Sequence, residues 1–383
     1  MSEPLGGFEE QGGGEELELA FGPRHPALQG VLRLRLALAG EAIVGCRPLI
    51  GYGHRGLEKL CETVSLRDGV ALTDRLDFVA AAAANLAYCG AVERLLGLAV
   101  PPRARFLRVV LAELQRVASH LLWLGTHAAD AGVEDALLPC LGDRDRVLDL
   151  LEEWCGARLT LRCAVPGGLP REPPAGCLDR CAVLAAALPA MVDRHEERLA
   201  AAARFKQRTV GLGVLSPEAA LEFGATGPVL RASGVDWDVR RALPYDAYAE
   251  LDFDVPVGRN GDAYDRYLVR LAELRQAALL VARCLDRLPP GAVWLAAPPG
   301  TAAVPEAESY FSVEGPRGEV GFYLTLGGRP ESDLAALRPW RCHVRAPSFY
   351  NLQLLPELAR GHGIAELVVL LGSLDLALGE VDR

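Results

Sequence analysis

The feature that most constrains the fold is a set of long segments whose apolar residues recur with helical period. Several of these segments are apolar nearly all round, so as helices they must be covered on every side and belong in the middle of a bundle. A further segment, 262–288, keeps its arginines to one side. The sequence therefore predicts a helical body, whose other long helices are expected over residues 73–96, 103–131, 144–157 and 178–205.

Short runs with strand-like alternation stand on either side of this body. ELELAF, VLRLRLAL and EAIVGCRPLI come before it, and SYFSVEG, EVGFYLTL and RCHVRA follow a proline-rich stretch. The predicted class is α+β, mainly α, with small N-terminal and C-terminal sheets. Residues 1–16 are glycine-rich and acidic and are expected to form a disordered tail. One domain is expected over 17–383, with an N-terminal sheet at 17–50, a helical body at 51–290 and a C-terminal α/β part at 291–383.

Charge and cysteine usage exclude several classes of protein. The formal net charge of −10 argues against nucleic-acid binding, which needs a basic surface. The ten cysteines form no C-x-x-C pair, and the N-terminus has no secretory pattern, so a reducing compartment is expected. The uncharged, alanine-rich run 78–92 falls short of the roughly 20 apolar residues of a spanning helix. At a membrane, the chain would have to be held by partners.

The segment GYGHRG, residues 51–56, matches the glycine pattern of dinucleotide-binding proteins. A Rossmann unit also needs a second strand with an acidic end about 20 residues further on. An alanine-rich helix is predicted there instead, so the context argues against a nucleotide site.

No metal site can be assigned from the sequence. Cys177 and Cys181 would share one face of a helix, but without a second cysteine pair or a nearby histidine they are expected to be core residues. The seven histidines form neither H-x-x-x-H nor H-E-x-x-H.

A group of polar residues is predicted to be embedded where an ordinary core would not hold them. Buried charges must be paired, so these residues form either a structural ion network between sheet and bundle or a functional cavity. Spacing alone does not decide between the two. The residues are His25, His54, Arg55, Asp74, Arg75, Asp77, His120, His127 and Asp130.

The same segments resemble the D-type (49 kDa-type) subunits of respiratory NADH-quinone oxidoreductase, complex I, a family related to the large subunits of nickel-iron hydrogenases. The matching strings include FGPRHPALQGVLRL, IGYGHRGLEKL, TDRLDFV, LAELQRVASHLLWLGTHAADAG, TGPVLRASGVDWDVRRALPYD and the terminal LGEVDR, in the expected order over nearly the whole chain. The resemblance implies a hydrogenase-large-subunit-like helical bundle. A nickel site is excluded, because it requires two pairs of cysteines and TDRLDFV and DLALGEVDR contain none.

The resemblance also implies a function. Such a protein forms the quinone-reduction chamber together with a neighbour that carries a terminal [4Fe-4S] cluster. Electrons come from NADH through FMN and iron-sulfur centres in partner subunits, and quinone reduction is coupled to proton translocation. The chain itself would bind no cofactor, and quinone would be its substrate. The expected partners are the B-like, C-like and membrane H-like subunits of such a complex, with the chain peripheral on the cytoplasmic side of the cell inner membrane.

Two residues expected to bind the quinone headgroup differ from the family pattern. The family loop HPxxHG reads HPALQG here, which places Gln29 at its second histidine, and the family tyrosine of DRLDY is Phe78. Gln29 still donates hydrogen bonds, but an amide does not titrate near neutral pH. Phe78 keeps the ring and lacks the phenol.

Other site residues are carried over on the same basis. Asp130 and His25 are the expected catalytic residues, and Asp130 is also expected to handle protons and to contribute to quinone binding. Arg55 and Arg75 match arginines that face the partner's cluster, where fixed positive charge would raise its reduction potential.

Two further departures from the family lie outside the headgroup pair. Thr160 and Val165 replace a family histidine and arginine, and between 290 and 314 a longer helical insert is missing. The changed headgroup pair keeps two alternatives open. One is a structural paralogue without the usual quinone chemistry, and the other is a complex with another quinone or another electron donor such as ferredoxin.

Overall fold

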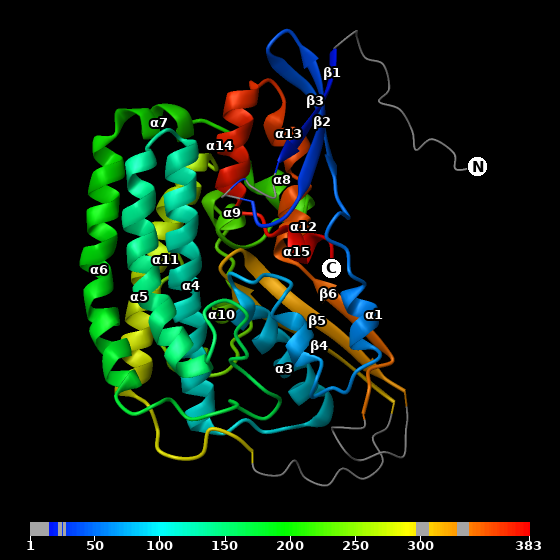
Figure 1. Cartoon of the computed structure of the whole chain (residues 1–383), viewed down its shortest axis with the longest axis vertical. Coiled ribbons are helices and arrows are strands. Elements are labelled where there is room, and N and C mark those ends of the chain that lie inside the picture. Colours follow the sequence, from blue (N-terminus) through cyan, green and yellow to red (C-terminus); the bar gives the residue numbers. More distant parts are fainter. Residues whose placement is uncertain (1–14, 22–24, 26–27, 296–305, 328–336) are drawn as a thin grey trace.

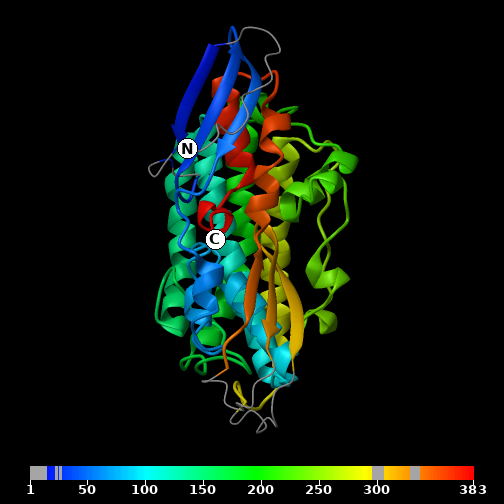
Figure 2. The ribbon, with the colours of Figure 1, turned by 90° about the vertical axis from the view of Figure 1, so that its right-hand side faces the viewer.

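The computed structural model of the chain describes residues 15–21, 25, 28–295, 306–327 and 337–383. Figure 1 shows a helical bundle on one side and two separate β-sheets on the other. In the view turned by 90°, the N-terminal sheet lies at one end of the elongated molecule and the C-terminal sheet lies toward the other end (Figure 2). The predicted α+β, mainly helical class is confirmed.

The bundle is built around α4, Pro102–Asp130, which packs against α5, Leu137–Cys155, and α11, Ala263–Asp286. Helix α6, Cys177–Ala201, covers α11 and α5 from outside. Helix α4 is buried along most of its length because it lies inside the bundle, as its nearly uniform apolar pattern predicted. The side chain of Asp262 accepts a hydrogen bond from the backbone N–H of Asp265, which caps the start of α11.

The N-terminal sheet consists of β1 (Glu15–Phe21), β2 (Leu32–Ala39) and β3 (Ala42–Leu49), antiparallel and in that order. In β2, the three leucines 32, 34 and 36 are fully buried and alternate with arginines that point away from the core. Helix α13, Leu355–Ala359, packs against β3. The predicted strands before the helical body are therefore confirmed.

The C-terminal sheet consists of β4 (Ala307–Gly315), β5 (Gly318–Leu326) and β6 (Arg341–Arg345), also antiparallel and in that order. Helix α3, Ala81–Leu96, covers β4 and β5. Tyr88 of α3 meets Phe322 of β5 edge to face at 5.4 Å between ring centroids. The hairpin turn between β4 and β5 carries Arg317 toward the middle of the molecule.

The predicted helix over 73–96 is interrupted. Helix α2 ends at Thr73 and α3 begins at Ala81, and the seven residues between them are not helical. The carboxylate of Asp77 accepts the backbone N–H groups of Val79 and Ala80, a local bond that competes with helical hydrogen bonding. The break exposes Phe78 and turns Asp77 into the protein.

The remaining helices are short or lie at the edges of the bundle. The predicted helix over 144–157 begins earlier, and the one over 178–205 is divided near residue 202. No helix in the described part of the chain is long and apolar enough to cross a membrane. The short helices are α1 (Leu57–Cys61), α2 (Val70–Thr73), η1 (Glu134–Ala136), α7 (Ala203–Thr209), α8 (Pro217–Glu222), α9 (Gly227–Ala232), α10 (Val239–Ala242), η2 (Tyr248–Glu250), α12 (Pro347–Leu352), α14 (Ile364–Leu374) and α15 (Leu378–Val381).

The predicted subdivision at residues 17, 50 and 290 stays a prediction. Residues 1–14 of the predicted tail and residues 296–305 of the shortened insert lie outside the described residues.

Candidate functional site

The backbone of Gln29 is fixed against the C-terminal segment. Gln29 forms a parallel bridge with Ala377, and its carbonyl oxygen accepts the N–H of Leu378 at 3.0 Å. The next residue, Gly30, has φ of +132° and lies so close to Leu378 that a Cβ there would clash with it. The loop that the resemblance implies lies at the quinone therefore packs directly against α15.

The side chain of Gln29 faces a buried ion pair. With its amide in the orientation that satisfies both polar atoms, the nitrogen donates to Asp77 Oδ1 at 3.3 Å and the oxygen accepts from Arg317 Nη2 at 2.6 Å. The Arg317 guanidinium also bonds to the Asp77 carboxylate and, at 3.0 Å, to Asp375 Oδ1. Three segments far apart in sequence, the DRLDF turn, the β4–β5 turn and the end of α14, thus meet at Gln29.

A third carboxyl group lies beside this pair. Glu380 is 2% exposed, and its carboxylate accepts the backbone N–H of Ser348 at 2.9 Å. Burial, reinforced by the nearby charge of Asp77, raises the pKa of Glu380 to about 8. Burial also raises the pKa of Asp77, although the Arg317 guanidinium opposes that effect.

The two residues predicted to be catalytic, His25 and Asp130, are brought together by the fold. His25 Nε2 lies 3.6 Å from Asp130 Oδ1, with Asp130 at the last residue of α4. Burial raises the pKa of Asp130 to about 7, against the opposing charge of Arg208. Burial lowers the pKa of His25. A carboxyl group that titrates near neutral pH is suited to accept and release a proton.

The absence of a side chain at Gly372 lets α14 pack closely against Asp130 and His127. A Cβ at Gly372 would lie 2.9 Å from Asp130 Oδ2 and 3.1 Å from His127 Nδ1. The His127 ring stacks on Trp123 at 4.9 Å, and the Arg270 guanidinium lies 4.2 Å from the Trp123 ring centroid. Burial and Arg270 lower the pKa of His127 to about 3, so this imidazole stays neutral at physiological pH.

His120 belongs to a structural network inside the bundle. Its Nε2 lies 2.9 Å from Glu273 Oε2, and Glu273 also pairs with Arg231 at 2.7 Å. Arg231 pairs in turn with Glu314 of β4 at 2.8 Å, which joins the bundle to the C-terminal sheet. For His120 the structural interpretation is therefore favoured. Glu113, Arg116, Asp238 and Arg240 complete the set, all fully or almost fully buried.

Some residues predicted to be embedded are instead at the surface. His54, Arg55 and Arg75 are exposed, so for them the expectation of burial was wrong. The loop 51–56 and the break between α2 and α3 run along the outside, where Arg55 Nη2 donates to the carbonyl of Arg75 at 3.3 Å. The two arginines thus lie side by side. Phe78 is 41% exposed and stands next to Asp77 rather than inside the core.

The glycine-rich loop binds an anion, but one from the chain itself. The backbone N–H groups of Gly51 and Gly53 donate to the two carboxylate oxygens of Asp382 at 2.7 and 2.6 Å. His54 Nδ1 lies 2.7 Å from the carbonyl oxygen of the same residue. Such N–H groups could otherwise hold a phosphate. Both described sheets are antiparallel, which also argues against a dinucleotide fold.

The described residues contain no group of three or more His, Cys, Asp or Glu side chains that could hold a metal ion. The cysteines are free, and all but Cys155 are buried, as the core interpretation of Cys177 and Cys181 expected.

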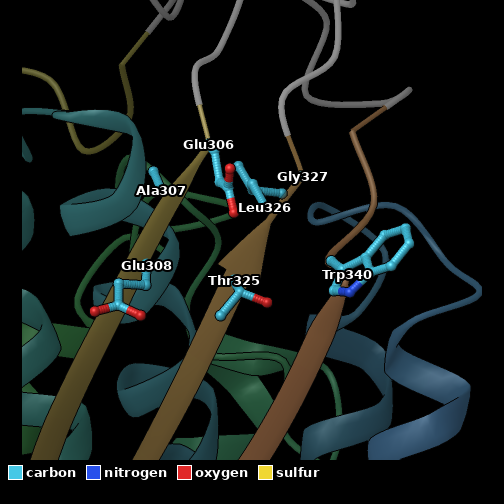
Figure 3. A pocket seen from close by; sticks show the side chains of 7 residues that line it. All are labelled: Glu306, Ala307, Glu308, Thr325, Leu326, Gly327 and Trp340. Carbon is cyan, nitrogen blue, oxygen red and sulfur yellow. The ribbon is translucent and has the colours of Figure 1, made fainter.

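A separate hollow lies at the C-terminal sheet. It measures about 630 Å³ and is lined by Glu306, Ala307, Glu308, Thr325, Leu326, Gly327 and Trp340 (Figure 3). Figure 3 places these residues at the open ends of β4, β5 and β6. Arg317 is at the opposite end of the β4–β5 hairpin, roughly 25 Å away at about 3.3 Å per strand residue.

Sequence reasoning missed three residues that contact or approach Gln29 and its ion pair: Arg317, Asp375 and Glu380. Arg317 stands in a short G-P-R-G turn, a pattern typical of a hairpin and not of a buried cation. Glu380 lies within LGEVDR, a segment that the resemblance had included without giving its residues a role. A buried arginine next to several acidic segments could have been a signal, but only the fold shows which acids it meets.

Comparison with known proteins places this mainly helical chain among the large subunits of respiratory-chain NADH dehydrogenases. The family model of the respiratory-chain NADH dehydrogenase 49 kDa subunit matches residues 130–303 and 299–383. The NADH-quinone oxidoreductase D 2 subunit of Solibacter usitatus is 43% identical over 368 residues, covering 96% of this chain and 97% of the relative. The D subunit of the same enzyme from Geotalea uraniireducens is 42% identical over 393 residues, covering 96% and 99%.

A third relative, the NADH-quinone oxidoreductase D 2 subunit of Thermodesulfovibrio yellowstonii, is 39% identical over 393 residues, covering 95% of this chain and 96% of the relative. The chain belongs to the D-subunit (49 kDa) family of NADH-quinone oxidoreductase, complex I.

Proposed function

We propose that this chain forms the quinone-reduction chamber of a proton-translocating NADH-quinone oxidoreductase, a translocase, together with a B-like neighbour. Two electrons from NADH would arrive through FMN and iron-sulfur centres of the partner subunits, ending at a [4Fe-4S] cluster. A C-like subunit and a membrane H-like subunit are further proposed partners. The complex would hold the chain at the cytoplasmic side of the cell inner membrane, and the chain would contribute residues rather than a cofactor.

The observation that carries this proposal is the agreement with relatives named as D subunits of NADH-quinone oxidoreductase over 95% or more of the chain. The geometry adds support, because the fold brings His25 Nε2 to 3.6 Å from Asp130 Oδ1, and both residues match the family at the site that the resemblance implies. Asp130 would handle a proton beside His25, because its pKa of about 7 lets it exchange protons near neutral pH.

Gln29 and Phe78 would meet the headgroup. The Gln29 amide is already engaged by Asp77 and Arg317, so it would present a fixed hydrogen-bonding group and not a titrating one. The exposed Phe78 would supply an aromatic ring. Arg55 and Arg75, side by side at the surface, would place two positive charges toward the partner's cluster and raise its reduction potential.

A second candidate is favoured by the absence of a titratable headgroup partner at both Gln29 and Phe78. In that case the chain would keep the assembly surface of the family and serve as a structural paralogue, or it would belong to a complex with another acceptor or a ferredoxin donor. The buried charge around Gln29 would then be purely structural.

The test is inhibitor-sensitive NADH:quinone reductase activity in membranes that contain this chain as their one D-type subunit, compared with membranes lacking it. Activity that depends on the chain supports the proposed function. Asp130→Asn is then expected to lower it strongly, whereas Asp254→Asn, at an exposed position outside the site, serves as the matched control. A fully assembled complex without quinone reductase activity would favour the second candidate, and activity with reduced ferredoxin would identify the donor.

A further inference from the structure

The ion cluster at Gln29 contains more acid than base. Asp77, Asp375 and Glu380 are 5%, 3% and 2% exposed, and Arg317 is the guanidinium that bonds to this set. Arg270 is the next cation, and the charge of Asp375 acts on it without direct contact. Three carboxylates against these two arginines leave one negative charge unbalanced in a region shielded from water. An unpaired buried carboxylate is costly, and binding a proton removes that cost.

Contacts indicate which carboxyl group holds the proton. Asp77 and Asp375 both bond directly to the Arg317 guanidinium, which stabilises their ionised forms. Glu380 has no cation within salt-bridge distance among the described residues, and its polar partner there is Ser348. Its neighbour Asp77 carries a like charge, which further favours the neutral form of Glu380. The ordinary pKa of a glutamate would leave it ionised, so the cluster itself must hold the proton in place.

We propose that Glu380, together with Asp77, stores one proton behind Gln29 and delivers it to the quinone when the quinone is reduced. This inference rests on the proposed function and adds a residue with no assigned role. Glu380 acts through Asp77, whose Oδ1 faces the Gln29 amide. It is therefore a proton-storing residue and not one that touches the substrate.

The quinone accepts two electrons from the partner's iron-sulfur cluster and two protons, and becomes a quinol. One proton leaves Asp130. For the other, the O–H bond of Glu380 breaks as its proton passes to Asp77, and the Asp77 proton forms a new O–H bond with the second quinone oxygen. The pair is left doubly ionised against Arg317, and a proton from solvent restores it.

The claim that Glu380 holds a proton at neutral pH is tested on the full-length chain by infrared pH-difference spectroscopy. This method detects the carbonyl band of a protonated carboxylic acid. The expected result is a band that persists at neutral pH and disappears around pH 8, following the pKa of about 8 of Glu380. Glu380→Gln should remove this band, and Glu357→Gln, on the exposed side of α13, should leave it unchanged. Asp77→Asn removes the neighbouring like charge and should shift the loss of the band to lower pH.

The Asp77→Asn arm also applies if Glu380→Gln does not fold. Asp130, with a pKa of about 7, adds a component of its own that is lost at lower pH. A spectrum without a component lost around pH 8, or such a component that survives Glu380→Gln, overturns the storage assignment. An unshifted band in Asp77→Asn overturns the coupling of the two residues.

The transfer of the Glu380 proton to the quinone is tested in the assembled complex. Glu380→Gln is expected to lower quinone reductase activity by roughly hundredfold or more, the size of a lost general acid. Adding Gln29→His to the same chain should restore part of the loss, because histidine supplies a titrating group at the headgroup. Full activity in Glu380→Gln would overturn delivery. If the unaltered complex reduces no quinone, the proposed function fails while the infrared result still decides whether Glu380 holds the proton.

Discussion

The carboxylate of Asp382 bonds to the backbone of Gly53, with Asp382 Oδ2 accepting the Gly53 N–H at 2.6 Å. The same side chain accepts the N–H of Gly51, so two donors of an exposed loop are satisfied by a residue from the C-terminal segment. The loop 51–56, which matches the dinucleotide-binding glycine pattern, is thus fixed by the C-terminal segment of the same chain. We call this contact of Asp382 with Gly51 and Gly53 the clasp. The clasp also positions Arg55 beside Arg75.

Asp382→Ala is expected to loosen this clasp. It removes the acceptor of two backbone N–H groups, at a cost of about 1–3 kcal/mol in the free energy of unfolding. Denaturant unfolding measures the cost, and limited trypsin digestion should cut faster after Arg55. Asp254→Ala, which removes an exposed carboxylate, is the control. Equal stability of the two variants would show that the bonds to Gly51 and Gly53 contribute little.

The pKa of Asp130 predicts a dependence of stability on pH. The unfolded carboxyl titrates near its ordinary value of 3.8 and the folded one at about 7, so between these values the native state holds a proton that the unfolded state has lost. Its contribution to stability is therefore complete below about pH 4 and decreases as pH rises to about 7. Unfolding free energies measured across this window should fall less steeply in Asp130→Asn than in the unaltered chain.

Other groups titrate in the same window, so the informative quantity is the difference between the two pH profiles. His25, whose pKa is lowered, contributes with the opposite sign, because the unfolded state binds its proton more readily. Parallel profiles for the unaltered chain and Asp130→Asn would contradict a raised Asp130 pKa.

Gly372→Ala is expected to separate packing from helix propensity. Alanine is the better helix former, but its Cβ would press on Asp130 Oδ2 and His127 Nδ1, so the variant should lose about 1–3 kcal/mol. The matched control is Gly142→Ala in α5, where a Cβ meets nothing within 4 Å and stability should rise by about 0.5–1 kcal/mol. Thermal unfolding of both variants measures the contrast, and a stabilised Gly372→Ala would mean that α14 moves aside freely.

Restoring the family pair tests the headgroup site. Gln29→His with Phe78→Tyr supplies a titrating imidazole next to Asp77 and a phenol at the exposed ring, so quinone reductase activity should rise by roughly tenfold or more if proton supply limits the rate. The measurement is made in the assembled complex, with Phe78→Tyr alone as the partial control. Unchanged activity in a correctly assembled double variant would argue against a proton-limited site.

The sequence predicted the elements whose signals are local. Helical period and strand alternation depend on near neighbours, so α4, α11 and the six strands were found close to their observed bounds. The break at Asp77 was missed because the apolar run that follows it reads as one continuous helix. Only the side-chain bonds from Asp77 to Val79 and Ala80 reveal the interruption.

The site was less accessible from the sequence. Resemblance supplied Gln29, Phe78 and Asp130, but no pattern connects Asp77 with Arg317, which lies 240 residues further along the chain. Their contact exists only because the β4–β5 hairpin ends beside the break after α2. The exposure of Arg55 and Arg75 also depends on the tertiary structure, so residue types alone could not predict it.

Helix α4 is held in a fixed position by buried contacts along its middle. It is 29 residues long, and its middle is held to other elements by the contacts Glu113–Arg240, Arg116–Glu273 and His120–Glu273, while Asp130 is its last residue. Rotation or translation of α4 would break all of these buried ion pairs at once. Any displacement that follows a change of charge at Asp130 must therefore be taken up by the opposing side, by α14 at Gly372 and by the segment of His25.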